Sequence, residues 1–416
     1  MRSARVLSTV LLAVAVVVAV ASPAPATRRP DSVGADPRRP GTTEPSWERR
    51  VDAIVGDRQV SVTIGQDGTF WYRHLAWIAR APASNEKLLL SMALLAAVGP
   101  GAVIPTQAMT HTAPTDGVID GNLWLVGDGD PELGPGRIDT LAREVAAAGV
   151  RRVDGSVVGD LGPFKRDWWS PGWKTYFPAE EVAIPTALTY RGNVGPQGLH
   201  IDDPELRAAT DLTEALRRHG VRVDGDPRTN KASRSLVAIA DVSSAPVEAI
   251  LRRMNVDSIN FDAEVLGKYL GAQTSHVGSI PSAAAAIHSF AAASGVRGFV
   301  EHDASGLSYA DRVTTQGLVR LLWAADRQPW GPVLRTSLPT AGQGTLEGRL
   351  GHLRVRAKTG TLTDISALSG WVWSSKADGW VEFSILSAGM SKDEAVRIED
   401  GIVGLVSAHA GSPGAN

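Results

Sequence analysis

The chain of 416 residues contains no cysteine. A disulfide framework, a cysteine-ligated zinc site and a thiol nucleophile are therefore excluded. The nine histidines are scattered and none lies in an H-E-x-x-H pattern, so we expect no metal and no other cofactor. The chain also has no large excess of positive or negative charge, because the formal net charge is −2 and no long basic run occurs. This balance argues against nucleic acid as a partner.

An apolar run at the N-terminus extends from Val6 to Ala21, behind the basic residues Arg2 and Arg5. Its length of about 16 residues is short for a membrane-spanning helix, which needs about 20. Small residues follow, with possible cleavage sites after Ala21 or after Ala26. Residues 1–26 therefore predict a signal peptide, with cleavage favoured over retention as a membrane anchor. We expect an exported protein of the extracytoplasmic envelope, the cell wall or the medium.

Lysine is scarce, because only eight of the 42 Lys and Arg residues are lysine. Two of the eight lie in short motifs, Ser84-Asn85-Glu86-Lys87 and Lys358-Thr359-Gly360, and Ser258-Ile259-Asn260 lies between them. This order of S-x-x-K, S-x-N and K-T-G is typical of serine enzymes that act on D-Ala-D-Ala peptides and β-lactams. Arginine cannot give up its proton in a protein, whereas a desolvated lysine can act as a base. The motifs thus use the rarer residue where this chemistry requires it.

Ser84 directly precedes an almost wholly apolar stretch that includes Leu88 to Leu95. A helix that is apolar on every face must be buried in its domain. Ser84 would then lie in the first turn, at the positive end of the helix dipole. Lys87 lies one turn further on and shares a helix face with Ser84.

Both ends of the chain's folded part predict strands. Val60–Ile64 alternates in polarity, and 69–77 can pair back as a hairpin; strands at 365–373 and 379–386 precede a closing helix at 393–408. We therefore expect an α/β sandwich of the transpeptidase type, with an antiparallel sheet that joins both chain ends. Helices are expected between these ends, at 245–255, 261–270, 282–294 and 315–325.

Changes in composition divide the chain into parts. From about Thr106 onward short strands alternate with glycine turns, which predicts an inserted, strand-rich α+β domain. A stretch rich in Pro, Gly, Arg and Thr precedes the first strand and predicts disorder. The predicted parts are a disordered linker at 27–46, a catalytic domain at 47–107 and 242–408, the inserted domain at 108–241, and a disordered tail at 409–416.

In these motifs and their surroundings the chain resembles the low-molecular-mass class C penicillin-binding proteins. These are serine D-Ala-D-Ala carboxypeptidases and endopeptidases of bacterial cell walls, and the resemblance extends over residues 58–408. The insertion between Ser84 and Ser258 is shorter than in most members, which implies a missing or trimmed subdomain. Tyr309 and Ala310 stand where many members have a charged pair, so we do not carry over the family's side-chain preference. Further segments that are similar to the family are 121–131, 158–160, 252–264, 305–308, 338–346 and 356–361.

The resemblance implies an acyl-enzyme mechanism. Ser84 would attack the penultimate carbonyl carbon, and Lys87 would take the hydroxyl proton. Burial of Lys87 beside the positive charge of Lys358 would lower its pKa in the required direction. Ser258 would relay a proton toward the leaving nitrogen, and Asn260 would hold Lys87 and a substrate amide.

The K-T-G segment would bind the substrate by the same resemblance. Lys358 would hold the terminal carboxylate together with the hydroxyls of Thr359 and Thr361. Gly360 would let the substrate backbone lie close to the strand. The backbone N–H groups of Ser84 and Thr361 would form the oxyanion hole.

The expected substrates are peptidoglycan stem peptides that end in D-Ala-D-Ala, and β-lactams would be covalent inhibitors. Removal of the terminal D-Ala and cleavage of an internal cross-link both remain open, because they use the same serine. One alternative is a β-lactamase, although no E-x-x-L-N loop supplies a second base. Another is a catalytically silent peptidoglycan-binding protein. The sequence predicts no oligomeric state.

Overall fold

A five-stranded antiparallel sheet lies at the centre of the part that holds both chain ends, in the order β11-β12-β13-β1-β2. The computed structural model describes residues 46–232 and 235–411. β1 pairs with β13, with Val60 opposite Ser387 and Gly65 opposite Glu382, so the sheet joins the two ends as predicted. Its strands are β1 (Val60–Gln66), β2 (Thr69–His74), β11 (Val355–Leu362), β12 (Ile365–Ser374) and β13 (Gly379–Ala388).

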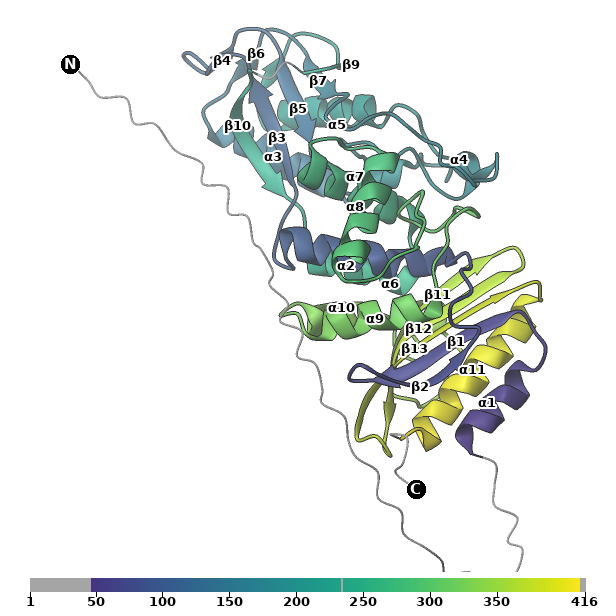
Figure 1. Cartoon of the computed structure of the whole chain (residues 1–416). Helices are drawn as coiled ribbons and strands as arrows, with labels where there is room; N and C mark the ends of the chain where they lie inside the picture. Colours follow the sequence, from purple (N-terminus) through teal and green to yellow (C-terminus); the bar gives the residue numbers. More distant parts are fainter. Residues whose placement is uncertain (1–45, 233–234, 412–416) are drawn as a thin grey trace, which may run out of the picture. The chain divides into compact units, whose positions relative to one another are not determined.

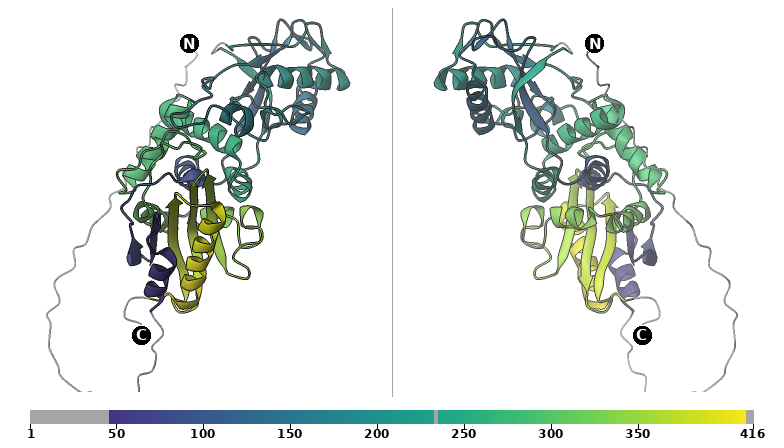
Figure 2. Two further views of the ribbon diagram at one scale, coloured as in Figure 1. Left: turned by 90° about the vertical axis from the view of Figure 1, so that its right-hand side faces the viewer. Right: turned by 90° about the vertical axis from the view of Figure 1, so that its left-hand side faces the viewer.

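Helices cover both faces of this sheet (Figures 1 and 2). In β12, Leu368 and Val372 share a core with α1 and α11, whereas Ala367 and Trp371 share a core with the other helices. This alternation follows from the period of two in a strand that is buried on both sides. The predicted sandwich is therefore confirmed. Its helices are α1 (Trp47–Val55) and α11 (Lys392–His409) on one face, and α2 (Glu86–Val98), α6 (Val247–Asp257), α7 (Asn260–Ser275), α8 (Ile280–Ala293), α9 (Thr315–Asp326) and α10 (Gly331–Ser337) on the other.

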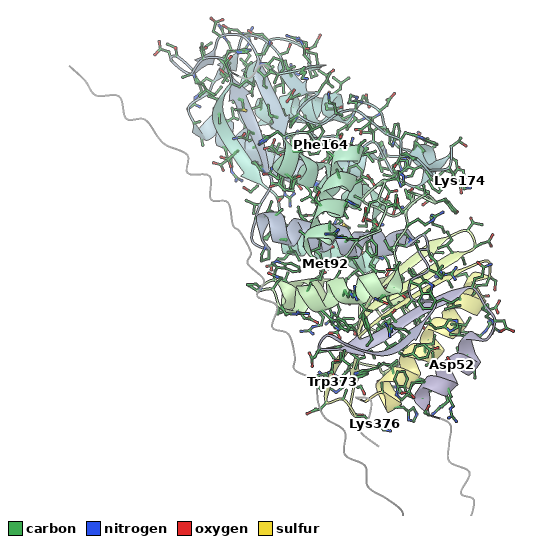
Figure 3. All side chains as sticks on the ribbon, in the orientation of Figure 1. Asp52, Met92, Phe164, Lys174, Trp373 and Lys376 are labelled. Carbon is green, nitrogen blue, oxygen red and sulfur yellow. The ribbon has the colours of Figure 1, made fainter. Side chains whose placement is uncertain are left out.

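Helix α2 runs through the middle of the helical layer. All residues from Glu86 to Leu95 are buried, and Met92, labelled in Figure 3, is completely enclosed. A helix without a polar face has to be packed on every side. α7 and α8 pack against α2, so the helix is a fixed support for the residues at its N-terminus.

A second, mixed sheet is built from the region between β3 and β10, in the order β10-β3-β5-β7-β9. β10 and β3 pair antiparallel, so the two strands that enter and leave this region lie side by side. A separate core of apolar residues fills the space between this sheet, α3 and α5. The elements are β3 (Pro105–Thr110), β5 (Leu123–Gly127), α3 (Pro135–Ala147), β7 (Val157–Asp160), α4 (Phe177–Glu180), α5 (Pro204–Arg218), β9 (Arg228–Asn230) and β10 (Val237–Ser243), with a small parallel sheet of β4 (Val118–Ile119), β6 (Arg152–Val153) and β8 (Arg222–Val223).

Several expectations concern the ends of the chain. The predicted signal peptide and nearly all of the predicted linker lie outside the described residues. The predicted disordered tail starts too early, because His409 is the last residue of α11 and Ala410 is completely buried. The Ala410 carbonyl accepts a hydrogen bond from Ser374 Oγ at 2.6 Å, which ties this end to β12. Across 46–232 and 235–411, no helix combines the length and the apolar character that a membrane span requires.

Candidate active site

Ser84 lies in a short 3-10 turn, η1 (Ala83–Asn85), that leads directly into α2. Ala83 has a φ of +47°, which is uncommon for a residue with a side chain, and this turns the backbone just before the serine. From 81 to 90, Ser84 is the only residue that is not buried. The hydroxyl is thus held at the end of a rigid helix and is still accessible.

The Lys87 ammonium group lies within hydrogen-bond distance of three oxygens. Nζ is 3.0 Å from Ser84 Oγ, 2.8 Å from Asn260 Oδ1 and 2.7 Å from the Ser305 carbonyl oxygen. The amide and carbonyl oxygens can only accept hydrogen bonds. A neutral amine that donates its two protons to them keeps its lone pair directed at the Ser84 hydroxyl. This arrangement can move the hydroxyl proton to Lys87.

Asn260 is the first residue of α7, and both ends of its amide are engaged. Oδ1 accepts from Lys87, and Nδ2 donates to the Glu181 carbonyl oxygen at 3.2 Å. Glu181 follows α4, so the region between β3 and β10 contributes directly to this site. The Glu181 carbonyl fixes which amide atom faces Lys87, since a carbonyl can only accept.

Ser258 connects α6 to α7 in a left-handed conformation, with φ 58° and ψ 41°. Non-glycine residues rarely adopt this conformation, and such strain is concentrated at functional sites. Ser258 Oγ lies 2.8 Å from Lys358 Nζ. The turn therefore directs the serine hydroxyl toward the K-T-G strand.

Lys358 and Gly360 occupy alternate positions of β11, the edge strand of the sheet. A Cβ atom on Gly360 would lie 2.8 Å from the Pro82 carbonyl oxygen and 3.0 Å from the Ser84 nitrogen, so only glycine allows this close approach. Lys358 is fully buried, and Nζ also donates to the Thr359 carbonyl oxygen at 3.0 Å. Among the described residues, the hydroxyls of Thr359 and Thr361 have no hydrogen-bond partner.

Burial lowers the pKa of Lys87 to about 8, and the nearby carboxyl groups of Asp303 and Glu264 act in the opposite direction. Burial is the main cause of this shift, and the expected repulsion between Lys87 and Lys358 is evident at Lys358. The pKa of Lys358 is also lowered, well below its ordinary value, first by burial and then by the charge of Lys87. The two lysines of the site thus do not favour being charged together.

Several carboxyl groups around Lys87 were not predicted. Glu264 accepts hydrogen bonds from the backbone N–H groups of Ala304 and Ser305 at 3.0 and 2.8 Å, which places the Ser305 carbonyl against Lys87. Burial raises the pKa of Glu264 to about 7. Glu86 is completely buried, and neither of its carboxyl oxygens has a hydrogen-bond partner among the residues that the structure describes. Residue spacing gives no signal for these contacts, since they run through backbone groups and a distant helix.

The segment that contains Trp169, Pro171 and Trp173 packs against this site. Trp173 is buried, and its Nε1 donates to Asp303 Oδ2 at 2.6 Å, whereas Trp169 is 49% exposed. Ser308 Oγ donates to the Pro171 carbonyl oxygen at 2.7 Å. Trp173 therefore has a packing role, whereas Trp169 lies at the surface.

Comparisons with known proteins agree with the motifs. The family model for the D-Ala-D-Ala carboxypeptidase 3 (S13) family matches residues 52–183 and 176–409. A D-alanyl-D-alanine carboxypeptidase of Actinomadura sp. is 28% identical over 417 residues, with 79% of this chain and 77% of the relative covered. The carboxypeptidase DacB of Mycolicibacterium smegmatis is 29% identical over 388 residues, with 84% and 82% covered.

Solved structures show the same fold. Penicillin-binding protein 4 (dacB) of Haemophilus influenzae superposes with a TM-score of 0.75 at 18% identity, and the match covers 86% of this chain and 99% of that one. A second structure of that protein, complexed with a β-lactam, gives a TM-score of 0.68 at 18% identity, with 86% and 99% covered.

Proposed function

The chain belongs to the D-Ala-D-Ala carboxypeptidase 3 (S13) family, and on this premise we propose that it is a serine carboxypeptidase in which Ser84 is the nucleophile and Lys87 the base. The single observation that carries these roles is the set of contacts at Lys87 Nζ. Two acceptors and one hydroxyl surround the amine, and the hydroxyl is that of the accessible serine.

Acylation begins when Ser84 Oγ attacks the carbonyl carbon of the penultimate D-Ala. The hydroxyl proton passes to the lone pair of Lys87, and the C–N bond to the terminal D-Ala breaks as the tetrahedral intermediate collapses. A pKa of about 8 leaves a usable neutral fraction of Lys87 near neutral pH. The ester on Ser84 is then hydrolysed by water, which releases the shortened peptide.

Ser258 and Lys358 act on the leaving side of this reaction. The Ser258 hydroxyl, 2.8 Å from Lys358 Nζ, passes a proton to the leaving amine. Lys358, Thr359 and Thr361 bind the substrate carboxylate, and the free threonine hydroxyls suit this role. The backbone N–H groups of Ser84 and Thr361 stabilise the oxyanion; loss of one such donor typically costs about 2.7–4 kcal/mol.

Peptidoglycan stem peptides are the substrates, and β-lactams acylate the same serine. Action on peptidoglycan places the protein outside the cytoplasm, and we propose that residues 1–26 are the export signal. We also propose that 108–241 is an insertion into a catalytic domain formed by 47–107 and 242–408. The antiparallel pair of β3 and β10 supports this division, since the insertion then leaves and re-enters at one place.

The first test incubates the exported form and its Ser84→Ala variant with a fluorescent penicillin and follows the covalent label over time. A stable label that the variant lacks supports a penicillin-binding acyl-enzyme. Rapid turnover that depends on Ser84 would favour the β-lactamase. A folded wild type without label would favour the silent binding protein.

A further inference from the structure

The carbonyl that accepts a hydrogen bond from Lys87 belongs to the peptide group between Ser305 and Gly306. Its oxygen lies 2.7 Å from Lys87 Nζ, and the N–H of the same peptide group, that of Gly306, donates to Asp303 Oδ1 at 2.7 Å. In a trans peptide the carbonyl and the N–H point in opposite directions within one rigid plane. Lys87 and the Asp303 carboxyl group are therefore linked through a single peptide group.

Asp303 is completely buried, and both of its carboxyl oxygens accept hydrogen bonds. Oδ2 accepts from the backbone N–H of Ser308 at 2.8 Å and from Trp173 Nε1 at 2.6 Å. With Gly306 this gives three N–H donors, which suits a carboxylate, because a carboxylate is an acceptor only. Trp173 comes from the segment between β7 and α4, so the carboxylate is held from two separate parts of the chain.

Gly306 also places this peptide group beside the nucleophile. Its φ is +81°, and a Cβ atom at this position would overlap the Ala83 carbonyl oxygen. Ala83 directly precedes Ser84, so the peptide group packs against the turn that holds the nucleophile. Glu264 of α7 accepts hydrogen bonds from the two backbone N–H groups before it. The orientation of the peptide group is thus fixed from three sides.

The charges around Lys87 act in the direction that this link requires. Burial lowers the pKa of Lys87, and the charge of Asp303 is the largest influence that opposes this shift. The carboxyl groups that act on Lys87 in this way are, from the largest effect, Asp303, Glu264, Glu86 and Asp262. The positive group that faces Lys87 is Lys358, whose own pKa is lowered by the charge of Lys87.

Proton transfer from Ser84 makes Lys87 positive. The dipole of the linking peptide group then has its oxygen toward the ammonium ion and its N–H toward the Asp303 carboxylate. Hydrogen bonds in such a chain polarise and strengthen one another. In nucleophilic catalysis a base is commonly oriented by a third group, and Asp303 is placed to do this for Lys87.

We propose that Asp303 is a positioning residue for acylation, which acts on Lys87 through the Ser305–Gly306 peptide group and stabilises the ammonium ion that forms as Ser84 attacks. This inference rests on the proposed function, because it requires Lys87 as the base. It also gives each acceptor of Lys87 a partner that fixes it. The Asn260 amide is fixed by the Glu181 carbonyl, and the Ser305 carbonyl is fixed by Asp303.

The test measures the rate of penicillin acylation and kcat/KM for D-Ala release from pH 6 to 9.5, in the wild type and in Asp303→Asn. The wild-type rate should rise with a midpoint near pH 8, as Lys87 loses its proton. Asp303→Asn removes a charge that keeps Lys87 protonated, so its midpoint should move to lower pH by about one unit. Its rate at high pH should fall about tenfold or more, because the ammonium ion is less stabilised. The loss should therefore be largest above pH 8 and small near pH 6.

Asp311→Asn is the matched control. Asp311 is a completely buried carboxyl group of the same loop, and it accepts a hydrogen bond from the His302 N–H at 2.8 Å and not from the peptide group that binds Lys87. This variant should keep the wild-type midpoint.

If Asp303→Asn does not fold, the link is measured in the wild type by NMR of the backbone amides over the same pH range. The Gly306 N–H shares its peptide group with the carbonyl that binds Lys87, so its chemical shift should change with the midpoint of Lys87. The Ser308 N–H donates to the same carboxylate from a different peptide group and should change less.

An Asp303→Asn rate that falls equally at every pH, with an unchanged midpoint, would overturn the inference, because a merely structural role gives that result. A Gly306 N–H that does not follow the titration of Lys87 would also overturn it. Both results leave the proposed function intact. Normal acylation by Lys87→Arg, or a wild-type rate that does not depend on pH near 8, would instead count against the proposed function.

Discussion

Lys87 on α2 and Lys268 on α7 are both completely buried, on helices that pack together, but their surroundings differ. Lys268 Nζ donates to the carbonyl oxygens of Lys165, Asp167 and Pro185 at 2.8–2.9 Å, and it lies 2.7 Å from Asp167 Oδ1. All of these oxygens only accept hydrogen bonds. Lys268 is therefore held as an ammonium ion that fastens the segment around the site to α7.

Lys87 is surrounded by two oxygens that only accept hydrogen bonds, the Ser305 carbonyl and the Asn260 amide oxygen, and by the Ser84 hydroxyl. The hydroxyl can donate as well as accept, so the amine can lose a proton without leaving any acceptor unpaired. Burial lowers the pKa of both lysines, and carboxylates oppose this shift in both, with Asp303 the largest such cause at Lys87 and Asp167 at Lys268. Since burial lowers the pKa of both lysines, the difference between them lies in their hydrogen-bond partners, and these suit Lys87 for the proposed role of base.

Replacement of Lys87 by arginine should give the largest effect. Lys87→Arg keeps the charge but cannot serve as a base, so acylation should fall by roughly 10²–10⁴-fold or more. The rate of covalent labelling by a fluorescent penicillin measures this loss. Lys376→Arg, at an exposed lysine labelled in Figure 3, is the control and should acylate normally. Near-normal acylation by Lys87→Arg would remove the role given to Lys87.

Replacement of Lys268 by methionine should lower the free energy of unfolding and have little effect on the rate of acylation. The three carbonyls would lose their donor and the Asp167 carboxylate its positively charged partner, so the free energy of unfolding should fall by about 3 kcal/mol. Urea denaturation measures this change. The acylation rate of the folded protein should fall less than tenfold. A stable Lys268→Met protein that no longer acylates would show that the two lysines are not separate in function.

The carboxyl group of Glu86, the residue before Lys87, is a further buried group with a shifted pKa. Burial, and then the charges of Glu301, Asp303 and Glu264, raise its pKa well above the ordinary value of 4.5, while Lys87 lowers it. The folded protein thus keeps a proton that the unfolded chain releases. This contribution to stability is fully present below about pH 4.5 and is lost as pH rises toward the raised pKa.

The Glu86→Gln variant has no carboxyl group to titrate here, so it tests whether the Glu86 carboxyl makes the folded protein less stable as pH rises. Between pH 5 and pH 7 the free energy of unfolding of the wild type should fall by about 1 kcal/mol relative to that of the variant. The change is this small because coupling to neighbouring groups spreads the titration over a wide pH range. Thermal unfolding of both proteins over this range measures the difference. A difference that stays constant or grows in favour of the wild type would mean that Glu86 is ionised in the folded protein.

The sequence motifs predicted the fold and named the side chains that the structure brings together at Ser84 and at Lys358. This was possible because these residues carry the chemistry themselves, in short spacings. The buried position of Lys268 was not predicted, because a lysine in a helix usually points to solvent. The Ser305 carbonyl and Glu264 act through the backbone, which leaves no pattern in residue types. Helix α1 was also missed, although Trp47, Val51 and Val55 are buried at a helical spacing of four.

The most direct test of the account is an NMR titration of protein labelled with ¹³C-lysine. Eight lysines give few signals, and Lys87→Arg and Lys268→Met identify the two of interest. We predict that Lys87 titrates with a midpoint near pH 8 while Lys268 stays protonated through that midpoint. A Lys87 that remains charged up to its ordinary pKa of 10.5 would contradict its assignment as the base.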